Sequence, residues 1–244
     1  MRDSSTVVRG AAAGRLHGRP AAAVRGGRAS LLLATAAVVY NDWLLEFLLP
    51  TGLDARHSYV SELYAVDQRF HVLFGGIEII AAVLVVTGAL LARDRTAGGL
   101  PSAGWWSLVA FGAFSVADVI VPMRCAPSIE RGCEAVNPWH TTTSALVHAA
   151  LFASMALLVL ASGPGPCPRP LIRRRGPWVL AGALLSALAT VGPLFGRPGW
   201  HGVPQRAHLV LVGVWFLLLA GALRKAPETA DAPVGARRVP ASVR

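Results

Sequence analysis

Six long runs of apolar residues dominate the chain, and segments rich in glycine, proline and charged residues separate them. Each run is close to the ~20 residues that an α-helix needs to cross a hydrocarbon core of ~30 Å. Lipid allows only helices or closed barrels to span it, and the runs are continuous rather than alternating, which favours helices. The sequence therefore predicts an all-α polytopic membrane bundle of six transmembrane helices, at about 30–49, 70–92, 103–123, 139–162, 177–196 and 206–223.

The regions outside these runs have a different composition. The chain as a whole is 54% hydrophobic, and its mean hydropathy is +0.51. Residues 1–28 are instead rich in arginine, alanine and glycine with no apolar face, and residues 225–244 are rich in proline, alanine and arginine. We therefore expect two disordered tails around a transmembrane domain at 29–224. The run at 31–49 is longer than the core of a signal peptide and lacks a small-residue cleavage site, which predicts an uncleaved span.

The net charge of +10 would suit a nucleic-acid partner, but its distribution along the chain indicates a membrane topology instead. Seventeen of the 23 lysine and arginine residues lie in the two tails, in the loop between the second and third runs, or in the loop between the fourth and fifth. The positive-inside rule then predicts a multi-pass protein of the cytoplasmic membrane with both termini cytoplasmic. We expect these cations to contact membrane lipid, and we expect no nucleic-acid partner. The pattern makes no prediction of oligomeric state.

Ionisable side chains interrupt the apolar runs, and all of them fall in the outer half of the predicted membrane. Such groups are costly in lipid and usually turn toward partners inside a bundle. His140 and His148 are two turns apart on one helical face, so one rotation brings both inward. We therefore predict an outward-facing polar cavity lined by Glu78, Asp118, His140, His148 and His208, with Ser61, Glu62 and Arg206 at its mouth.

Simpler interpretations of several of these residues remain open. Arg206 is close enough to the headgroups to reach them with its side chain. The segment between the first two runs is too short and polar to span, and Ser58 is placed to cap a short interfacial helix there, with Glu62 one turn on. Asp42 and Glu46 are four residues apart, so in an α-helix they would share a face near the outer end of the first span.

Two of the three cysteines, Cys125 and Cys133, fall in one predicted external loop. An oxidising exterior permits a disulfide between them, and the alternative is two unpaired thiols. The spacing does not match a zinc knuckle.

Four short motifs follow one another along the chain: Ser58-Tyr-Val-Ser61-Glu62-Leu, an exit of Asp118 and Pro122 from the third run, His140 and His148 in the fourth, and Gly202-Val-Pro-Gln205-Arg206 before the sixth. In order and spacing they resemble the prokaryotic six-helix membrane family catalogued as domain of unknown function 998, over about residues 30–223. The chain departs from that pattern in its cysteine-bounded loop and at Tyr64, where a glycine is usual. The resemblance implies an architecture and no activity.

Three functions fit the predicted cavity, and they leave open whether the protein is an enzyme. The first is binding or moving a lipid or small amphiphilic ligand, which needs no cofactor. The second is an intramembrane metal-dependent hydrolase of a lipid-like substrate, distantly similar to the alkaline ceramidases, with zinc held by Asp118, His140, His148 and His208. The third is an assembly partner within an envelope complex.

Overall fold

A computed structural model of the protein describes residues 24–93, 98–133, 137–163, 169–195 and 199–224. Within these ranges the chain is helical and contains no strand. A first helix covers residues 24–39, and five longer helices follow it: α2 (His71–Ala92), α3 (Gly99–Ile120), α4 (Pro138–Leu160), α5 (Pro170–Ala189) and α6 (Gly202–Arg224). Short 3-10 helices lie in the connections: η1 (Asp42–Phe47), η2 (Val60–Tyr64) and η3 (Gly192–Phe195).

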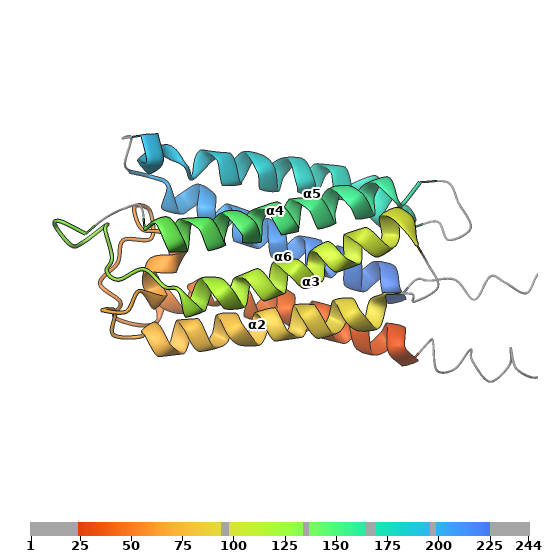
Figure 1. Cartoon of the computed structure of the whole chain (residues 1–244), viewed down its shortest axis with the longest axis horizontal. Helices are drawn as coiled ribbons and strands as arrows, with labels where there is room; N and C mark the ends of the chain where they lie inside the picture. The colour runs from red at the N-terminus through yellow and green to blue at the C-terminus, as the bar shows by residue number, and fades with distance from the viewer. Residues whose placement is uncertain (1–23, 94–97, 134–136, 164–168, 196–198, 225–244) are drawn as a thin grey trace, which may run out of the picture.

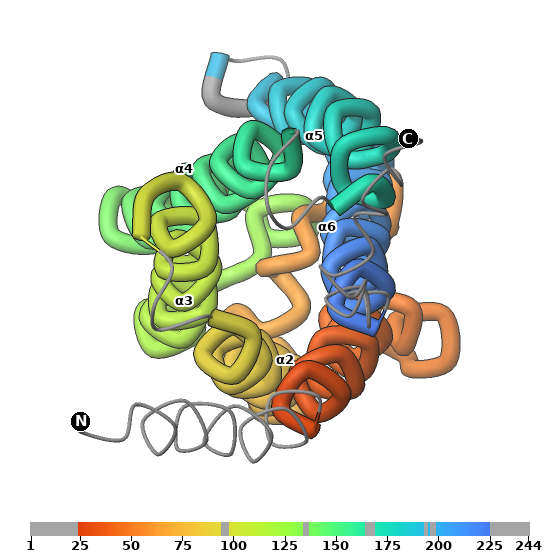
Figure 2. The backbone as a smooth tube through the Cα atoms, turned by 90° about the vertical axis from the view of Figure 1, so that its right-hand side faces the viewer, coloured from red at the N-terminus to blue at the C-terminus, as the bar shows by residue number. Residues whose placement is uncertain are grey.

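The six helices run side by side along the long axis and form a ring in chain order (Figures 1 and 2). The ring closes between the first helix and α6, where Ser30 Oγ donates to the Ala220 carbonyl over 2.9 Å. Among the described residues, α2, α3, α4 and α6 are long and apolar enough to cross a membrane. The first helix is shorter, and α5 carries three arginines near its start. The predicted all-α membrane bundle is therefore confirmed.

The first span differs from the single helix predicted at 30–49. The helix is already formed at residue 24, inside the stretch predicted to be a tail, and it ends at residue 39. Asn41 explains this end, because its Nδ2 donates to the Ala37 carbonyl and its Oδ1 accepts from Trp43 Nε1. A side chain that bonds the local backbone in this way competes with the helical ladder. The rest of the predicted tails, 1–23 and 225–244, lies outside the described residues.

The fifth span also begins earlier than predicted. Helix α5 starts at Pro170 rather than near 177, and proline suits a first helical position because its missing N–H would be unpaired there anyway. The helix ends at Ala189, so Pro193 lies beyond it in η3 and does not kink it. The arginines at 173–175 thus belong to the first turns of α5 and not to a coil.

An aromatic cluster from the end of the first helix, α3 and α6 lies within the ring. The rings of Tyr40, Phe111 and Phe216 lie 5.7–5.9 Å apart, and all three side chains are buried. Trp105 and Trp215 extend the apolar core from this cluster toward one end of the bundle. At that end the first helix begins and α6 ends. This part of the bundle, in the described residues, is filled by packed apolar side chains, and we call it the solid end.

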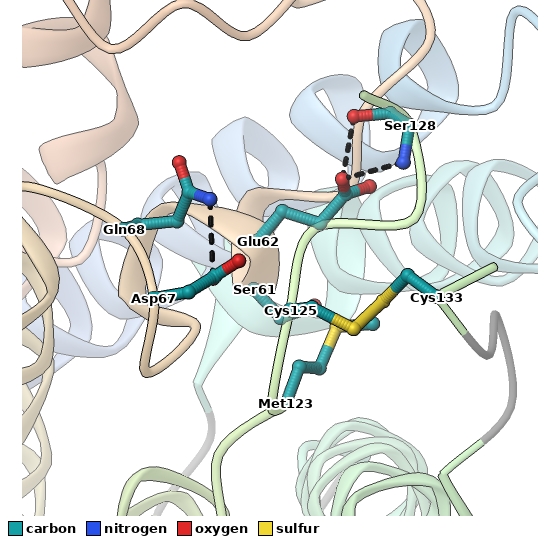
Figure 3. The surroundings of a disulfide bond; sticks show 8 residues. All are labelled: Ser61, Glu62, Asp67, Gln68, Met123, Cys125, Ser128 and Cys133. Atoms are coloured by element: carbon teal, nitrogen blue, oxygen red, sulfur yellow. Dashed lines mark hydrogen bonds between the residues drawn. A yellow bond between two sulfur atoms is a disulfide. The ribbon is translucent and has the colours of Figure 1, made fainter. Parts of the chain in front are cut away.

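The opposite end of the bundle carries a layer of connecting segments, gathered at the left of Figure 1. Two backbone hydrogen bonds join segments far apart in the chain, from Val66 N–H to the Met123 carbonyl and from Gly202 N–H to the Arg56 carbonyl. Cys125 and Cys133 form a disulfide with Cα atoms 6.0 Å apart, and this loop packs against η2 (Figure 3). The layer is therefore bound tightly to the helix ends beneath it.

Replacing both Cys125 and Cys133 by serine is expected to lower the free energy of unfolding by ~2–3 kcal/mol, because closing a short loop removes entropy from the unfolded chain. Graded SDS unfolding of the purified protein measures this loss. The matched control is Cys167→Ser, which changes the third cysteine and is expected to be neutral. Mass spectrometry of unreduced peptides checks the bridge itself, and two free thiols would contradict it.

Candidate functional site

A cavity of about 200 Å³ lies between the helices at the end that carries the connecting segments. The first helix's end, η1, η2, α2, α3, α4 and α6 all contribute to its wall. Tyr40 of the aromatic cluster forms part of its lining, so this cluster adjoins the cavity, and we call it the aromatic floor. The polar lining includes Asp42, Ser61, Tyr64, Glu78, Ser115, Asp118, His140, Ser144, His148, Gln205 and His208.

Asp118, in the last turn of α3, organises one wall. Its Oδ1 accepts from the hydroxyls of Thr143 (2.5 Å) and Ser144 (2.8 Å), and its Oδ2 accepts from the Tyr64 hydroxyl (3.0 Å). Burial, with the nearby carboxylates of Asp118 and Glu78, raises the pKa of the Tyr64 hydroxyl well above its usual value, so this group stays a donor. Asp118 thus joins α3, α4 and η2, and its oxygens are largely occupied by protein donors.

The three histidines of the lining are oriented in the same way. Each Nδ1 lies against a backbone carbonyl: His140 against Val121 (3.1 Å), His148 against Ser144 (2.7 Å) and His208 against Ala183 (3.0 Å). A carbonyl oxygen only accepts hydrogen bonds, so each Nδ1 carries the proton. In the neutral rings, Nε2 is then the nitrogen with a free lone pair, and the cavity has three such acceptors along its wall.

His148 of α4 and His208 of α6 stack on each other in the cavity wall, with ring centroids 5.1 Å apart. Phe152 lies against both of them, at 6.2 Å from His148 and 5.8 Å from His208. His140 instead approaches Asp118, with its Nδ1 3.4 Å from Oδ1. The histidines therefore form a stacked pair and a separate acid-paired ring.

Glu78 and Ser115 are polar residues of the lining whose side chains lack a protein partner among the described residues. No hydrogen bond or ion pair joins the Glu78 carboxylate to any of them. Ser115 is 2% exposed, and its buried Oγ has no hydrogen-bond partner. Buried polar groups are normally satisfied, so both point to a polar occupant of the cavity, either water or a ligand.

Arg206 and Glu62, predicted at the cavity mouth, are not part of the lining. Arg206 makes a two-pronged ion pair with Glu46, with Nε–Oε1 at 2.6 Å and Nη2–Oε2 at 2.7 Å, and its Nη1 donates to the Ser58 carbonyl at 2.9 Å. The side chains are 7% and 3% exposed. Glu46 lies in η1, so it does not share a face with Asp42 as predicted, and a buried partner rather than snorkelling explains the position of Arg206.

Glu62 is fully buried and holds the layer of connecting segments together. Its carboxylate accepts from the Tyr59 N–H at 2.8 Å. It also accepts from the Ser128 N–H at 3.0 Å and from the Ser128 hydroxyl at 2.5 Å (Figure 3). Tyr59 and not Ser58 is the cap residue of η2, because the Ser58 hydroxyl donates to the Asp54 carbonyl instead.

The motif at the start of α6 makes contacts with the same segment. Gly202 packs so closely that an added Cβ would lie 2.2 Å from the Ala55 carbonyl oxygen. Gln205 Oε1 accepts from the Val60 N–H at 2.7 Å. Together with Arg206, these residues fasten α6 to residues 55–60. The two most recognisable motifs of the sequence are therefore structural, although Ser61 and Gln205 also line the cavity.

The alternative metal site is not assembled. Within the part of the chain that the structure describes, no group of three or more histidine, cysteine, aspartate or glutamate side chains could hold a metal ion. Asp118 accepts from hydroxyls, His140 pairs with it, and His148 stacks with His208 rather than converging on a common point. The expected ligand set Asp118, His140, His148 and His208 is divided between two places.

Several lining residues were not predicted. Tyr40 and Asp42 reach the cavity because the first helix ends just before them. Tyr64 reaches it from η2 and donates to Asp118. A signal for Ser144 was present, because it shares a helical face with His140 and His148. No comparable signal exists for Ser115, which looks like an ordinary small residue of an apolar helix.

Comparison with known proteins agrees with this architecture. The family model described as "Protein of unknown function (DUF998)" matches residues 29–222, which include all six helices except the beginning of the first and the end of the last. No curated protein matches the chain. No solved structure matches it either. The match covers most of the chain, and the protein belongs to the DUF998 family of proteins of unknown function.

Proposed function

We propose that the protein binds a lipid or small amphiphile, and moves it to or from the membrane, with the polar end of the ligand in the cavity. The observation that carries this proposal is the cavity itself, about 200 Å³ of space inside a membrane bundle, with polar groups that the protein leaves unpartnered. A few placed polar groups in an otherwise apolar pocket are typical of small-molecule sites.

The lining supports an amphiphilic ligand because it is mixed. Val60, Met123, Val147 and Leu209 contribute apolar surface beside the histidines and carboxylates. The aromatic floor closes the cavity toward the solid end of the bundle, so a ligand reaches it from the end with the connecting segments. A site closed at one end suits uptake or release at one face of the membrane.

Replacement of His148 by leucine tests the proposal. The change places an apolar side chain in the cavity wall and removes one hydrogen-bond acceptor. We therefore expect the protein in nanodiscs to bind six-carbon amphiphiles, such as hexylamine or hexanol, at least tenfold more weakly. Equilibrium dialysis, with empty nanodiscs subtracted, measures this. The matched control is His71→Leu, because His71 is an exposed histidine at the start of α2 and lies outside the cavity. Equal binding by both variants, or no binding by the unmodified protein, would contradict the proposal.

We further propose that the cavity faces outward and that both termini are cytoplasmic. The end of the bundle opposite the cavity carries Arg93, Arg173, Arg174, Arg175 and Arg224, as the positive-inside rule requires of the inner side. Exposed tryptophans mark both ends, with Trp178 at the arginine-rich end and Trp139 and Trp200 at the cavity end. Such residues favour the headgroup region.

Single cysteines test this topology in a Cys167→Ser background that keeps the disulfide. Ile129→Cys, in the loop at the cavity end, is expected to react with an impermeant thiol reagent in intact cells. Gly98→Cys, at the other end, is expected to react only after the cells are permeabilised. The reverse pattern would place the cavity on the cytoplasmic side.

A further inference from the structure

We propose that the polar end of the ligand is a protonated amine, and that Glu78 is its counter-ion. This inference rests on the proposed function and names the chemical class of ligand for the same cavity. It follows from the kind of polar group that the lining presents.

The lining contains three acidic side chains. They are Asp42, Glu78 and Asp118, and no lysine or arginine among the described residues lines it. The arginine of the neighbouring motif, Arg206, is buried and occupied by Glu46. A phosphate or carboxylate headgroup would therefore enter a site of its own sign with no cation to receive it, whereas a cation would be attracted.

Several hydrogen-bonding groups of the lining present acceptors to the cavity. The hydroxyls of Tyr64 and Ser144 donate their protons to Asp118, so neither hydroxyl has a donor left for a ligand. His148 and His208 donate through Nδ1 to backbone carbonyls and retain only the acceptor Nε2. An alkylammonium group has donors and no acceptor, so it complements this wall.

Glu78 is the carboxylate best placed to receive the cation. Asp118 already accepts three hydroxyl hydrogen bonds and lies near His140. The Asp42 carboxylate lies close to the backbone N–H groups of Asp42 and Trp43 at the start of η1. Glu78 has no hydrogen bond or ion pair with any described residue, although it lies close enough to Tyr64 to influence its hydroxyl.

The unpartnered Ser115 hydroxyl is a second, independent sign of a ligand. It comes from α3, is almost completely buried, and lines the same cavity. A bare metal cation is not what this arrangement favours, because the described residues offer no group of three ligands. An organic cation needs only one counter-ion, a few acceptors and space, all of which are present. The rings of Tyr40 and Tyr59 in the lining add faces that attract cations.

The test compares three six-carbon probes that differ only in their polar end: hexylamine, hexanol and hexanoate. Binding to the full-length protein in nanodiscs of zwitterionic lipid is measured at neutral pH by equilibrium dialysis, with empty nanodiscs subtracted. We expect hexylamine to bind at least tenfold more tightly than either other probe. In Glu78→Gln this preference is expected to fall to less than threefold, because the counter-ion is lost while the shape is kept.

The matched control is Glu130→Gln, the same change at an exposed glutamate of the disulfide-bounded loop. It is expected to keep the full preference for hexylamine. Thermal unfolding of each variant accompanies the binding measurement, and Glu78→Gln is expected to fold at least as well as the unmodified protein, since Glu78 makes no hydrogen bond that the change would break.

The outcomes separate this inference from the proposed function. Binding of hexanol or hexanoate as tight as that of hexylamine would overturn the inference and leave the amphiphile proposal standing. Binding of none of the three probes would overturn both. An undiminished hexylamine preference in folded Glu78→Gln would show that Glu78 is not the counter-ion and would overturn the inference as stated.

Discussion

Arg206→Met is expected to destabilise the protein by ~3–5 kcal/mol, the usual cost of removing one member of a buried ion pair. The change leaves the Glu46 carboxylate buried and unpaired, and it removes the donor that holds the Ser58 carbonyl. Because Glu46 lies in η1 and Arg206 in α6, the loss also separates the first and last elements of the ring at the cavity end. The midpoint of SDS-induced unfolding, followed by intrinsic tryptophan fluorescence, measures the effect.

The matched control is Arg56→Met, because Arg56 pairs with Asp54 on the surface, with the two side chains 59% and 45% exposed. Exposed pairs contribute little, so we expect no measurable shift. The double change Glu46→Leu with Arg206→Met is expected to recover most of the stability, since no charge is left unpaired. An Arg206→Met protein as stable as the control would show that the pair is not what holds these elements together.

Gly202→Ala is the second change with a large expected effect. The added methyl group would lie 2.2 Å from the Ala55 carbonyl oxygen, 2.6 Å from the Ser58 carbonyl oxygen and 2.8 Å from Arg206 Nη1. Two of these neighbours are backbone atoms that cannot rotate away, so the start of α6 must move. Overpacking costs ~1–3 kcal/mol, and displacement of Arg206 from Glu46 adds to this. The same SDS unfolding measurement applies.

Gly76→Ala is the control for the glycine change. Gly76 lies inside α2, and nothing lies within 4 Å of the position that its Cβ would take. Alanine is favoured over glycine in a helix by ~0.5–1 kcal/mol, so this variant is expected to be as stable as the unmodified protein or more so. If Gly202→Ala behaved like Gly76→Ala, the close packing of α6 on residues 55–58 would be refuted. Gly202 and Arg206 are in contact, so the effects of changing both are not expected to add.

The apolar runs predicted the helices well because the requirement to span lipid acts on nearly every residue of a run. Breaks in the runs were predicted less well. The end of the first helix depends on one side chain, Asn41, that bonds to Ala37 and Trp43. Such a local choice does not change the hydropathy of the stretch. The early start of α5 was missed for another reason. The arginines at 173–175 lower the hydropathy of this stretch, yet arginines are good helix formers wherever their side chains reach solvent.

The depth of polar residues predicted much of the cavity lining. The structure places Ser61, Glu78, Asp118, His140, His148 and His208 around it. A polar group deep in a membrane bundle avoids lipid only by facing the interior, so its depth along the helix predicts that it lines an internal cavity. Arg206 and Glu62 lie nearer the surface layer, where several partners compete. The actual partner of Arg206 is Glu46, 160 residues away, and no local pattern connects two such positions.

The aromatic floor formed by Tyr40, Phe111 and Phe216 has an electrical consequence. Water in the cavity would conduct the potential of the adjoining solution down to these rings, so most of the transmembrane voltage would fall across the solid part of the bundle beyond them. The full voltage amounts to ~2.3 kcal/mol per elementary charge per 100 mV. An ion that travels from the solution to Glu78 would cross only the part of this voltage that the cavity spans. Occupancy by an ion would then depend weakly on membrane potential, whereas passage beyond the floor would depend on it steeply.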